Sequence, residues 1–236
     1  MKKYDEYEIS TITFENVHYP KEMSKTNKKP RLYYKGDITL VNRNKNIAVI
    51  GTRRVSENGR KIAYETGRIL AEKQVTVVNG LALGCDAEAV RGALAAGGKC
   101  IAVMPCGLEQ VQPKSNYGLA EKILNNGGCL ISEYPVGNII KKYQYVERDR
   151  IQSEISQGVL IIEADEKSGT MHTADFALRQ QKRLACYYHK LIELSKGNEI
   201  LENAGKATIL KSSEDVEVYI DKIKNETEYQ QMTLWN

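Results

Sequence analysis

The stretch IAVIGTRRVSENGRK, residues 47–61, decides how this part of the chain folds. Its first four residues are apolar and mostly β-branched, which is typical of a strand buried on both faces of a parallel sheet. Gly51 ends the strand, a polar turn follows, and Ser56 or Asn58 can cap a helix. The glycine pattern of a dinucleotide site is missing, as is the Gly-Lys-Ser/Thr of a P-loop, so we expect neither site.

The same unit of strand, turn and helix recurs along the chain. Steady alternation of this kind predicts an α/β fold with a doubly wound, mostly parallel sheet in a single main domain. Short apolar runs predict strands at residues 46–51, 75–80, 99–104, 128–133, 158–164 and 183–188. Periodic apolar positions or alanine-rich runs predict helices at residues 56–73, 86–98, 116–128 and 168–183. Asp86 stands at the expected N-cap of the second helix.

Composition changes along the chain indicate the domain boundaries. Residues 1–45 are polar and irregular, and we expect an extension packed on the core. Residues 46–211 form the main domain, residues 212–225 a C-terminal helix, and residues 226–236 a flexible tail. The N-terminal lysines are not followed by an apolar segment, so we expect no signal peptide, and no run is long enough to span a membrane.

The bulk composition excludes several classes of protein. The net charge of +4 is too small to make a nucleic-acid surface by itself, so any such surface must be a local patch. The five cysteines are odd in number and form no Cys-x-x-Cys pair, which favours a reducing cytoplasm over a disulfide framework. The three histidines are far apart, and we expect neither a metal nor a cofactor.

In an open parallel sheet, ligands bind beyond the carboxyl ends of the strands. Backbone N–H groups at helix starts, hydroxyl groups and arginine in these turns favour phosphate. The alternative is that the glycines only form tight turns, that Asp86 caps a helix, and that Glu163 pairs with an arginine. The candidate residues in the turns are Gly51, Thr52, Arg53, Arg54, Gly80, Ala82, Gly84, Ser168, Gly169 and Thr170.

These turns, taken in order, resemble the DNA-processing protein A family, also called DprA or Smf. The matching stretches include VIGTRRVSENGRKIA, VVNGLALGCDAEAVRGALAAGG, GCLISEYPVG and VLIIEADEKSGTMHTADFALRQQKR, and the likeness covers roughly residues 19–210. The resemblance implies an extended Rossmann-like domain that binds single-stranded DNA, forms a homodimer and hands the strand to a RecA-type recombinase. It further implies a role in competence or related recombination, without catalytic turnover. We expect no winged-helix domain of the kind that some members carry.

The resemblance also implies which residues hold DNA. Carried over to this sequence, the phosphate pocket includes Gly51, Arg53, Gly80, Ala82, Gly84, Ser168, Gly169 and Thr173. An Arg-Asn-Arg element of the family falls on Arg148, Asp149 and Arg150, where this chain has aspartate in the middle. Glu147 and Glu154 add negative charge, and Val90 replaces a usual histidine. A carboxylate near a phosphate site weakens binding unless it pairs with Arg148 or Arg150.

Two further segments are candidates for contact with a strand or a partner. Lys141 and Lys142 begin KKYQY, a loop with the cations and aromatic rings that single-strand binders use, although it is equally consistent with a solvated loop. The chain ends in QQMTLWN, which resembles the pentapeptide by which bacterial replication proteins bind the sliding clamp. The alternative is that these residues fold back onto the domain. The tail residues concerned are Gln231, Met232, Leu234 and Trp235.

Two other functions remain open. Related Rossmann-like folds bind or process nucleotides, and the cytokinin-activating phosphoribohydrolases have a similar motif with a required glutamate. Thr173 stands at that position here, which argues against the hydrolase but not against a nucleotide sensor. The third possibility is a dimerisation module that uses residues 158–164 and the following helix as an apolar face.

Overall fold

The computed structural model describes residues 1–43, 45–193 and 195–233. Within that part of the chain, nine strands form one sheet in the order β1-β2-β6-β5-β4-β3-β7-β8-β9. The parallel strands are β3 (Asn46–Ile50), β4 (Thr76–Asn79), β5 (Cys100–Met104), β6 (Cys129–Ser132), β7 (Gly158–Ile161), β8 (Arg183–Tyr187) and β9 (Thr208–Leu210). The predicted α/β class with a mostly parallel sheet is confirmed.

The N-terminal extension adds strands to this sheet instead of only packing on it. β2 (Leu32–Gly36) pairs antiparallel with β6, and β1 (Ser10–Ile12) pairs antiparallel with β2. The short helix α1 (Lys21–Ser24) lies between these two strands in sequence, and its Met23 is fully buried. The extension therefore shares the core of the main domain.

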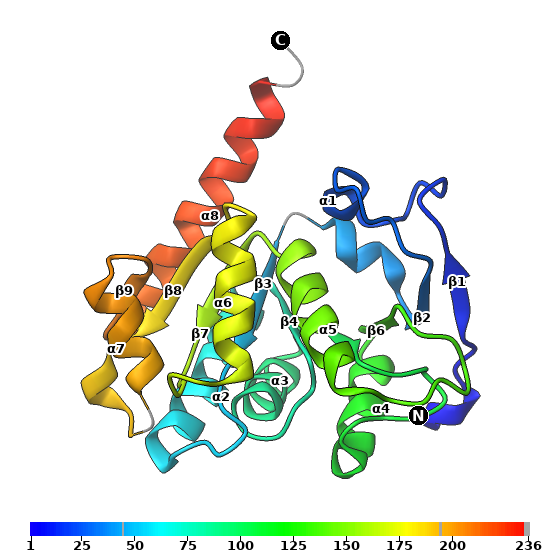
Figure 1. Ribbon diagram of the computed structural model, residues 1–236, viewed down its shortest axis with the longest axis horizontal. Coiled ribbons are helices and arrows are strands. Elements are labelled where there is room, and N and C mark those ends of the chain that lie inside the picture. Colours follow the sequence, from blue (N-terminus) through cyan, green and yellow to red (C-terminus); the bar gives the residue numbers. More distant parts are fainter. Residues whose placement is uncertain (44, 194, 234–236) are drawn as a thin grey trace.

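Helices cover both faces of the sheet, because alternate residues of each buried strand enter different cores. In β3, Ile47 and Val49 join a core with α2 (Glu57–Glu72), α3 (Cys85–Ala95), α4 (Tyr117–Asn125) and α8 (Ser213–Thr233). Ala48 and Ile50 join the opposite core with α5 (Lys142–Glu154), α6 (Gly169–Arg179) and α7 (Lys196–Asn203). Figure 1 shows α5 and α6 side by side on this second face.

Three predictions about elements are wrong. KKYQY is not a loop, because α5 begins at Lys142 and the side chain of Gln144 accepts a hydrogen bond from the Lys141 N–H. β7 lies between β3 and β8 with every residue buried, so residues 158–164 cannot supply an apolar dimer face. α8 continues to Thr233, past the predicted end at residue 225, because its added residues are mostly good helix formers.

The N-caps of α2 and α3 test the helix starts that the sequence predicts. Ser56 caps α2, as predicted, and its Oγ accepts a hydrogen bond from the Gly59 N–H at 3.0 Å. Asp86 is not the N-cap of α3; that position belongs to Gly84, whose φ of 77° suits a residue without a side chain. No helix in the described ranges is long and apolar enough to cross a membrane.

Candidate nucleic-acid interface

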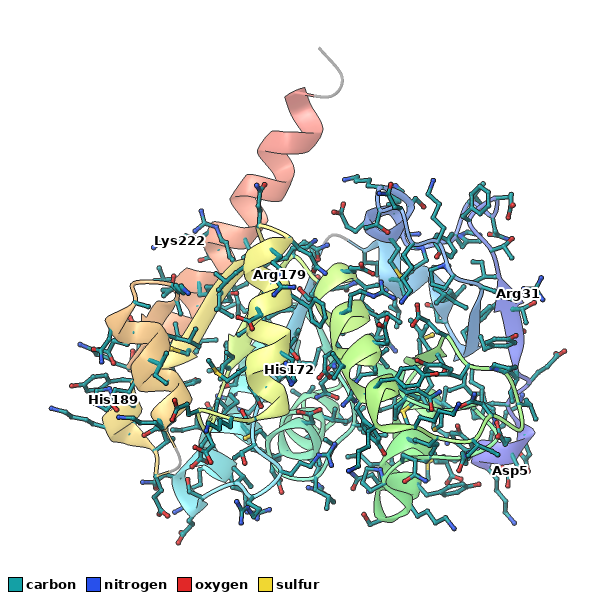
Figure 2. The ribbon with its side chains drawn as sticks, in the orientation of Figure 1. Asp5, Arg31, His172, Arg179, His189 and Lys222 are labelled. Atoms are coloured by element: carbon teal, nitrogen blue, oxygen red, sulfur yellow. The ribbon has the colours of Figure 1, made fainter. Side chains whose placement is uncertain are left out.

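A cavity of about 270 Å³ opens at the carboxyl ends of β3 and β4, between α5 and α6. We call it the α5–α6 cavity. Its walls come from the turn after β3, the loop after β4, one face of α5 and the first turns of α6. Figure 2 shows His172 on the side of α6 that faces α5. The predicted site residues that line the cavity are Gly51, Thr52, Arg53, Ala82, Arg148, Ser168, Gly169, Thr170 and Thr173.

A second cavity of about 180 Å³ adjoins the first, and we call it the Leu83 cavity. It is lined by the predicted Gly80 and by Leu83, Gln112 and Pro113, and it shares Arg53, Ala82, Tyr145 and Arg148 with the α5–α6 cavity. Leu83 is 45% exposed and gives this cavity an apolar side chain. We call the two cavities together the recess, because the four shared residues line both.

Arg53 supplies the exposed positive charge of the recess. Its guanidinium carbon lies 5.3 Å from the centre of the Tyr145 ring, close enough for a cation–π interaction. No ion pair with Arg53 occurs in the described part of the chain. The guanidinium is therefore free to donate hydrogen bonds to an anion at the solvent-exposed edge of the recess, which we call the rim.

Arg148 lies in the wall of the recess, and its side chain is hydrogen-bonded to other residues of the protein. Its side chain is 7% exposed, its Nε donates to Asp149 Oδ1 at 2.9 Å, and its Nη1 donates to the Val103 carbonyl at 3.4 Å. Nη1 packs so close to Gly80 that a β-carbon there would lie 1.3 Å away. Gly80 is therefore needed to make room for the arginine.

Asp86 occupies the backbone donors that the sequence assigns to a ligand. Its Oδ2 accepts hydrogen bonds from the N–H groups of Gly80 at 3.0 Å and Ala82 at 3.3 Å. The carboxyl is 4% exposed, and burial raises its pKa to about 6, although the nearby Arg148 acts in the opposite direction. Asp86 thus holds the loop after β4 in place, and these amides are not available to DNA.

Arg150 is the clearest wrong assignment. It points away from the recess because residues 148 and 150 face different sides of a helix. Its guanidinium pairs with Glu133 at 2.6 Å, with Glu154, and with Glu147 at 3.5 Å, and its side chain is only 11% exposed. Arg150 therefore holds α5 to the end of β6, and Glu147 and Glu154 are its partners rather than a charge near the phosphate site.

The remaining predicted residues lie outside both cavities. Arg54, Lys141 and Lys142 are exposed and line neither cavity. A β-carbon on Gly84 would lie 2.3 Å from the Thr52 carbonyl, so this glycine serves the packing of the loop. Val90 is fully buried in the core and lines neither cavity.

Glu163 anchors the start of α2 and does not face a ligand. Its Oε2 accepts hydrogen bonds from the N–H and the Oγ of Ser56, both at 3.0 Å, and its carbonyl accepts one from the Thr52 N–H at 2.7 Å. The turn that follows β3 is therefore fixed at both ends. This rigidity presents Arg53 at the rim.

Sequence reasoning missed Gln152 and His172, which both line the α5–α6 cavity. Tyr145, Asp149 and Gln152 follow one another at helical spacing on α5. A prediction of this segment as a helix would therefore have placed them on one face. No group of three or more His, Cys, Asp or Glu that could hold a metal occurs among the described residues.

The sheet and the recess at its carboxyl edge define a Rossmann-like protein with a cavity at the strand ends. A family model for DNA recombination-mediator protein A matches residues 10–221, and the chain belongs to that family. The predicted DprA/Smf resemblance is confirmed.

Individual relatives agree with this assignment. DNA processing protein DprA of Bacillus subtilis (strain 168) is 29% identical over 214 residues, which cover 90% of this chain and 72% of that protein. Protein Smf of Escherichia coli (strain K12) is 34% identical over 174 residues, which cover 73% of this chain and 46% of that protein. A solved structure of DNA processing protein A from Helicobacter pylori, described for its single-stranded DNA binding mode, matches with a TM-score of 0.81 and 29% identity. That match covers 95% of this chain and 99% of the other.

Proposed function

We propose that this protein binds single-stranded DNA at the recess formed by the α5–α6 and Leu83 cavities. The observation that carries the proposal is the position of Arg53 over the Tyr145 ring, at the mouth shared by both cavities. A guanidinium that stacks on an aromatic ring offers a charge for a phosphate and a face for a base. Membership of the recombination-mediator family, and the strand binding described for the Helicobacter relative, support this proposal.

Phosphate contact belongs to the rim of the recess. The first turn of α6 brings the N–H groups of Gly169 and Thr170 to one wall, while the Ser168 hydroxyl donates its hydrogen to the Asp165 carbonyl at 2.7 Å. Lys141 and Lys142 are exposed at the start of α5, beside Tyr143, which is 58% exposed. The phosphates of a strand that crosses the rim would contact these two lysines, and Arg54 would add a third positive charge.

The test is a titration of fluorescein-labelled oligo-dT by fluorescence anisotropy, repeated over a salt series. Binding through several phosphates should weaken with salt by a slope of roughly −0.7 per contact. Arg53→Ala should lower the affinity by about 1–3 kcal/mol, because a charge-assisted hydrogen bond is lost. The matched control is Arg179→Ala, an exposed arginine at the far end of α6 (Figure 2). Equal binding by Arg53→Ala and the wild type would refute the assignment.

The biological role that we propose is recombination mediation without catalytic turnover. The protein would act in the cytoplasm as a homodimer and deliver the strand to a RecA-type recombinase, in competence or a related recombination process. Sedimentation equilibrium tests the homodimer, and strand exchange by the recombinase with and without this protein tests the delivery. A monomer at micromolar concentration would contradict the homodimer. An unchanged rate of strand exchange would contradict delivery of the strand to the recombinase.

A nucleotide-binding sensor is the second candidate function, because the α5–α6 cavity has the size of one nucleotide. Processing of that nucleotide finds no support, since Thr173 stands where the phosphoribohydrolases need glutamate. A mononucleotide should then bind as well as an oligonucleotide. Dependence of affinity on oligonucleotide length separates the two functions.

The clamp-binding tail stays a separate proposal. Leu234 and Trp235 lie outside the described residues, while Gln231 and Met232 belong to the last turn of α8, which extends away from the sheet (Figure 1). Its support is the sequence of the pentapeptide. Deletion of residues 231–236 should abolish binding to the sliding clamp in surface plasmon resonance, and absence of binding by the intact chain would end the proposal.

A further inference from the structure

Residues 2–7, which we call the N-terminal segment, pack against α4, and Figure 1 shows them beside that helix. Tyr4 is fully buried in this contact, and its N–H donates to Glu121 Oε2 at 2.8 Å. The Lys2 N–H donates to Asn125 Oδ1 at 2.9 Å, and Asn125 Nδ2 donates back to the Lys2 carbonyl at 2.8 Å. The backbone of the N-terminal segment is therefore fixed to α4 at two points.

A buried lysine and a second tyrosine fix the position of the Tyr4 ring. Lys35 of β2 is 3% exposed, and its Nζ lies 3.9 Å from the centre of the Tyr4 ring and donates to the Tyr4 carbonyl at 3.2 Å. The ring also packs on Tyr117, the first residue of α4, with 5.0 Å between the ring centres. Tyr117 Oη donates to Asp5 Oδ2 at 3.0 Å. Contacts from β2 and α4 thus leave the Tyr4 hydroxyl in a defined place.

The Tyr4 hydroxyl reaches the loop after β5, which gives one wall to the recess. Its Oη donates to the Leu108 carbonyl at 2.9 Å, in a buried hydrogen bond between residues 104 positions apart. Burial raises the pKa of Tyr4, so the hydroxyl keeps its proton at neutral pH. No other hydrogen bond to this carbonyl occurs in the described part of the chain. Four residues further on, Gln112 and Pro113 line the Leu83 cavity.

The same loop is also fixed beyond Gln112 and Pro113. Asn116 Nδ2 donates to the carbonyls of Leu81 at 2.8 Å and Ala82 at 3.3 Å, and Ala82 lines both cavities. The wall of the Leu83 cavity therefore lies between two fixed points, the hydrogen bond to Tyr4 and the hydrogen bonds of Asn116. Loss of either point should make this part of the loop open more often, because local opening is opposed by few other contacts there.

We propose that Tyr4 is a positioning residue for strand binding, which acts through the Leu108 carbonyl on the place of Gln112 and Pro113 in the recess. The proposal rests on the strand binding proposed above and extends its determinants to a segment outside the recess. Tyr4 itself lines neither cavity. Without its hydroxyl the Leu108 carbonyl would be buried without a donor, and the loop could satisfy it only by moving towards water.

The test is Tyr4→Phe, which keeps the ring beside Lys35 and removes only the hydroxyl. The matched control is Tyr19→Phe, because Tyr19 is 2% exposed, donates to the Pro30 carbonyl at 2.8 Å, and lines neither cavity. Both variants should unfold at a somewhat lower urea concentration than the wild type. Only Tyr4→Phe should raise the dissociation constant for labelled oligo-dT, by roughly threefold to tenfold. The salt slope should not change, since the phosphate contacts remain.

Amide hydrogen exchange, followed by mass spectrometry of a peptide that spans residues 105–113, is the second measurement. Exchange should be faster in Tyr4→Phe than in the wild type and unchanged in Tyr19→Phe, because only Tyr4 is bonded to this loop. If Tyr4→Phe does not fold, Asn125→Ala takes its place. It removes the two hydrogen bonds to Lys2 and should change the affinity and the exchange in the same direction by smaller factors.

Wild-type affinity in Tyr4→Phe would overturn the proposal, even if the loop exchanges faster, because the position of the wall would then not matter to the strand. An equal loss of affinity in Tyr19→Phe would overturn it as well, since the effect would follow stability alone. If the wild-type chain binds no oligo-dT, the proposed strand binding fails by itself. Faster exchange in Tyr4→Phe would in that case still support the hold of Tyr4 on the wall, and unchanged exchange would refute it.

Discussion

Replacement of Asp86 by asparagine tests the electrostatics of the recess through the pH dependence of stability. Asp86 is buried with its Oδ2 on two backbone N–H groups, and its pKa rises from 3.8 to about 6 because burial disfavours the charged carboxylate. In this case burial outweighs the nearby Arg148 and the two hydrogen bonds. The folded chain therefore binds the Asp86 proton more tightly than the unfolded chain does.

The sign and size follow from that difference in pKa. A group whose folded pKa is raised contributes stability that is fully present below pH 3.8 and is lost as the pH rises through about 6. About two pH units correspond to about 3 kcal/mol at 1.36 kcal/mol per unit. Asparagine does not titrate, so the difference in unfolding free energy between wild type and Asp86→Asn should change by about that amount between pH 7 and pH 4.

The assay is urea unfolding of both chains at several pH values between 4 and 7, with the slope against urea compared to confirm a two-state transition. The wild type should gain stability relative to Asp86→Asn as the pH falls. Asp175→Asn, which removes an exposed carboxylate, should show no such gain. Parallel profiles would refute the reasoning, and so would a relative loss of wild-type stability in acid, since that result means that Arg148 and the amides control the carboxyl.

Three further substitutions test the packing and the proposed contacts. Gly80→Ala should lower the unfolding free energy by roughly 3–5 kcal/mol in urea titrations, because its β-carbon displaces Arg148 from a buried ion pair; an unchanged midpoint would contradict the close contact. Arg150→Met should cost a similar amount, roughly 3–5 kcal/mol, because it leaves buried carboxylates unpaired, and it should not alter the affinity for oligo-dT of the folded fraction. Tyr145→Ala should weaken oligo-dT binding by about 1–3 kcal/mol with the salt slope unchanged, whereas Arg53→Ala should also reduce the slope by about 0.7. Equal salt slopes for the last two variants would show that Arg53 meets no phosphate.

The strands of the sheet are predictable from the sequence because they are buried on both faces and bounded by glycine or polar turns. α5 is not predictable in the same way. The residues that it buries include Gln144, Arg148, Asp149, Gln152 and Glu154, which bond to one another and to the protein around them. A helix that buries polar side chains shows no apolar stripe, so the usual periodic pattern is missing.

The residues of the candidate site also differ in how far the sequence predicts them. The turns at the strand ends bring Gly51, Arg53, Ser168 and Thr173 together, as the topology of a parallel sheet dictates. The partners of the predicted donors depend on contacts between distant segments, such as Arg148 against Gly80. Such contacts leave no local pattern in the sequence, which is why the packing of Arg148 on Gly80 is not predictable from it.

The charge arrangement bears on how a protein with little net charge would hold the strand that we propose. Arg148 pairs with Asp149 inside the recess and donates two of its five N–H groups to the protein, while Asp86 occupies the loop amides. Arg53 carries no such partner among the described residues and stands at the rim. We therefore expect a phosphate to be attracted mainly by Arg53, because Asp149 offsets the charge of Arg148.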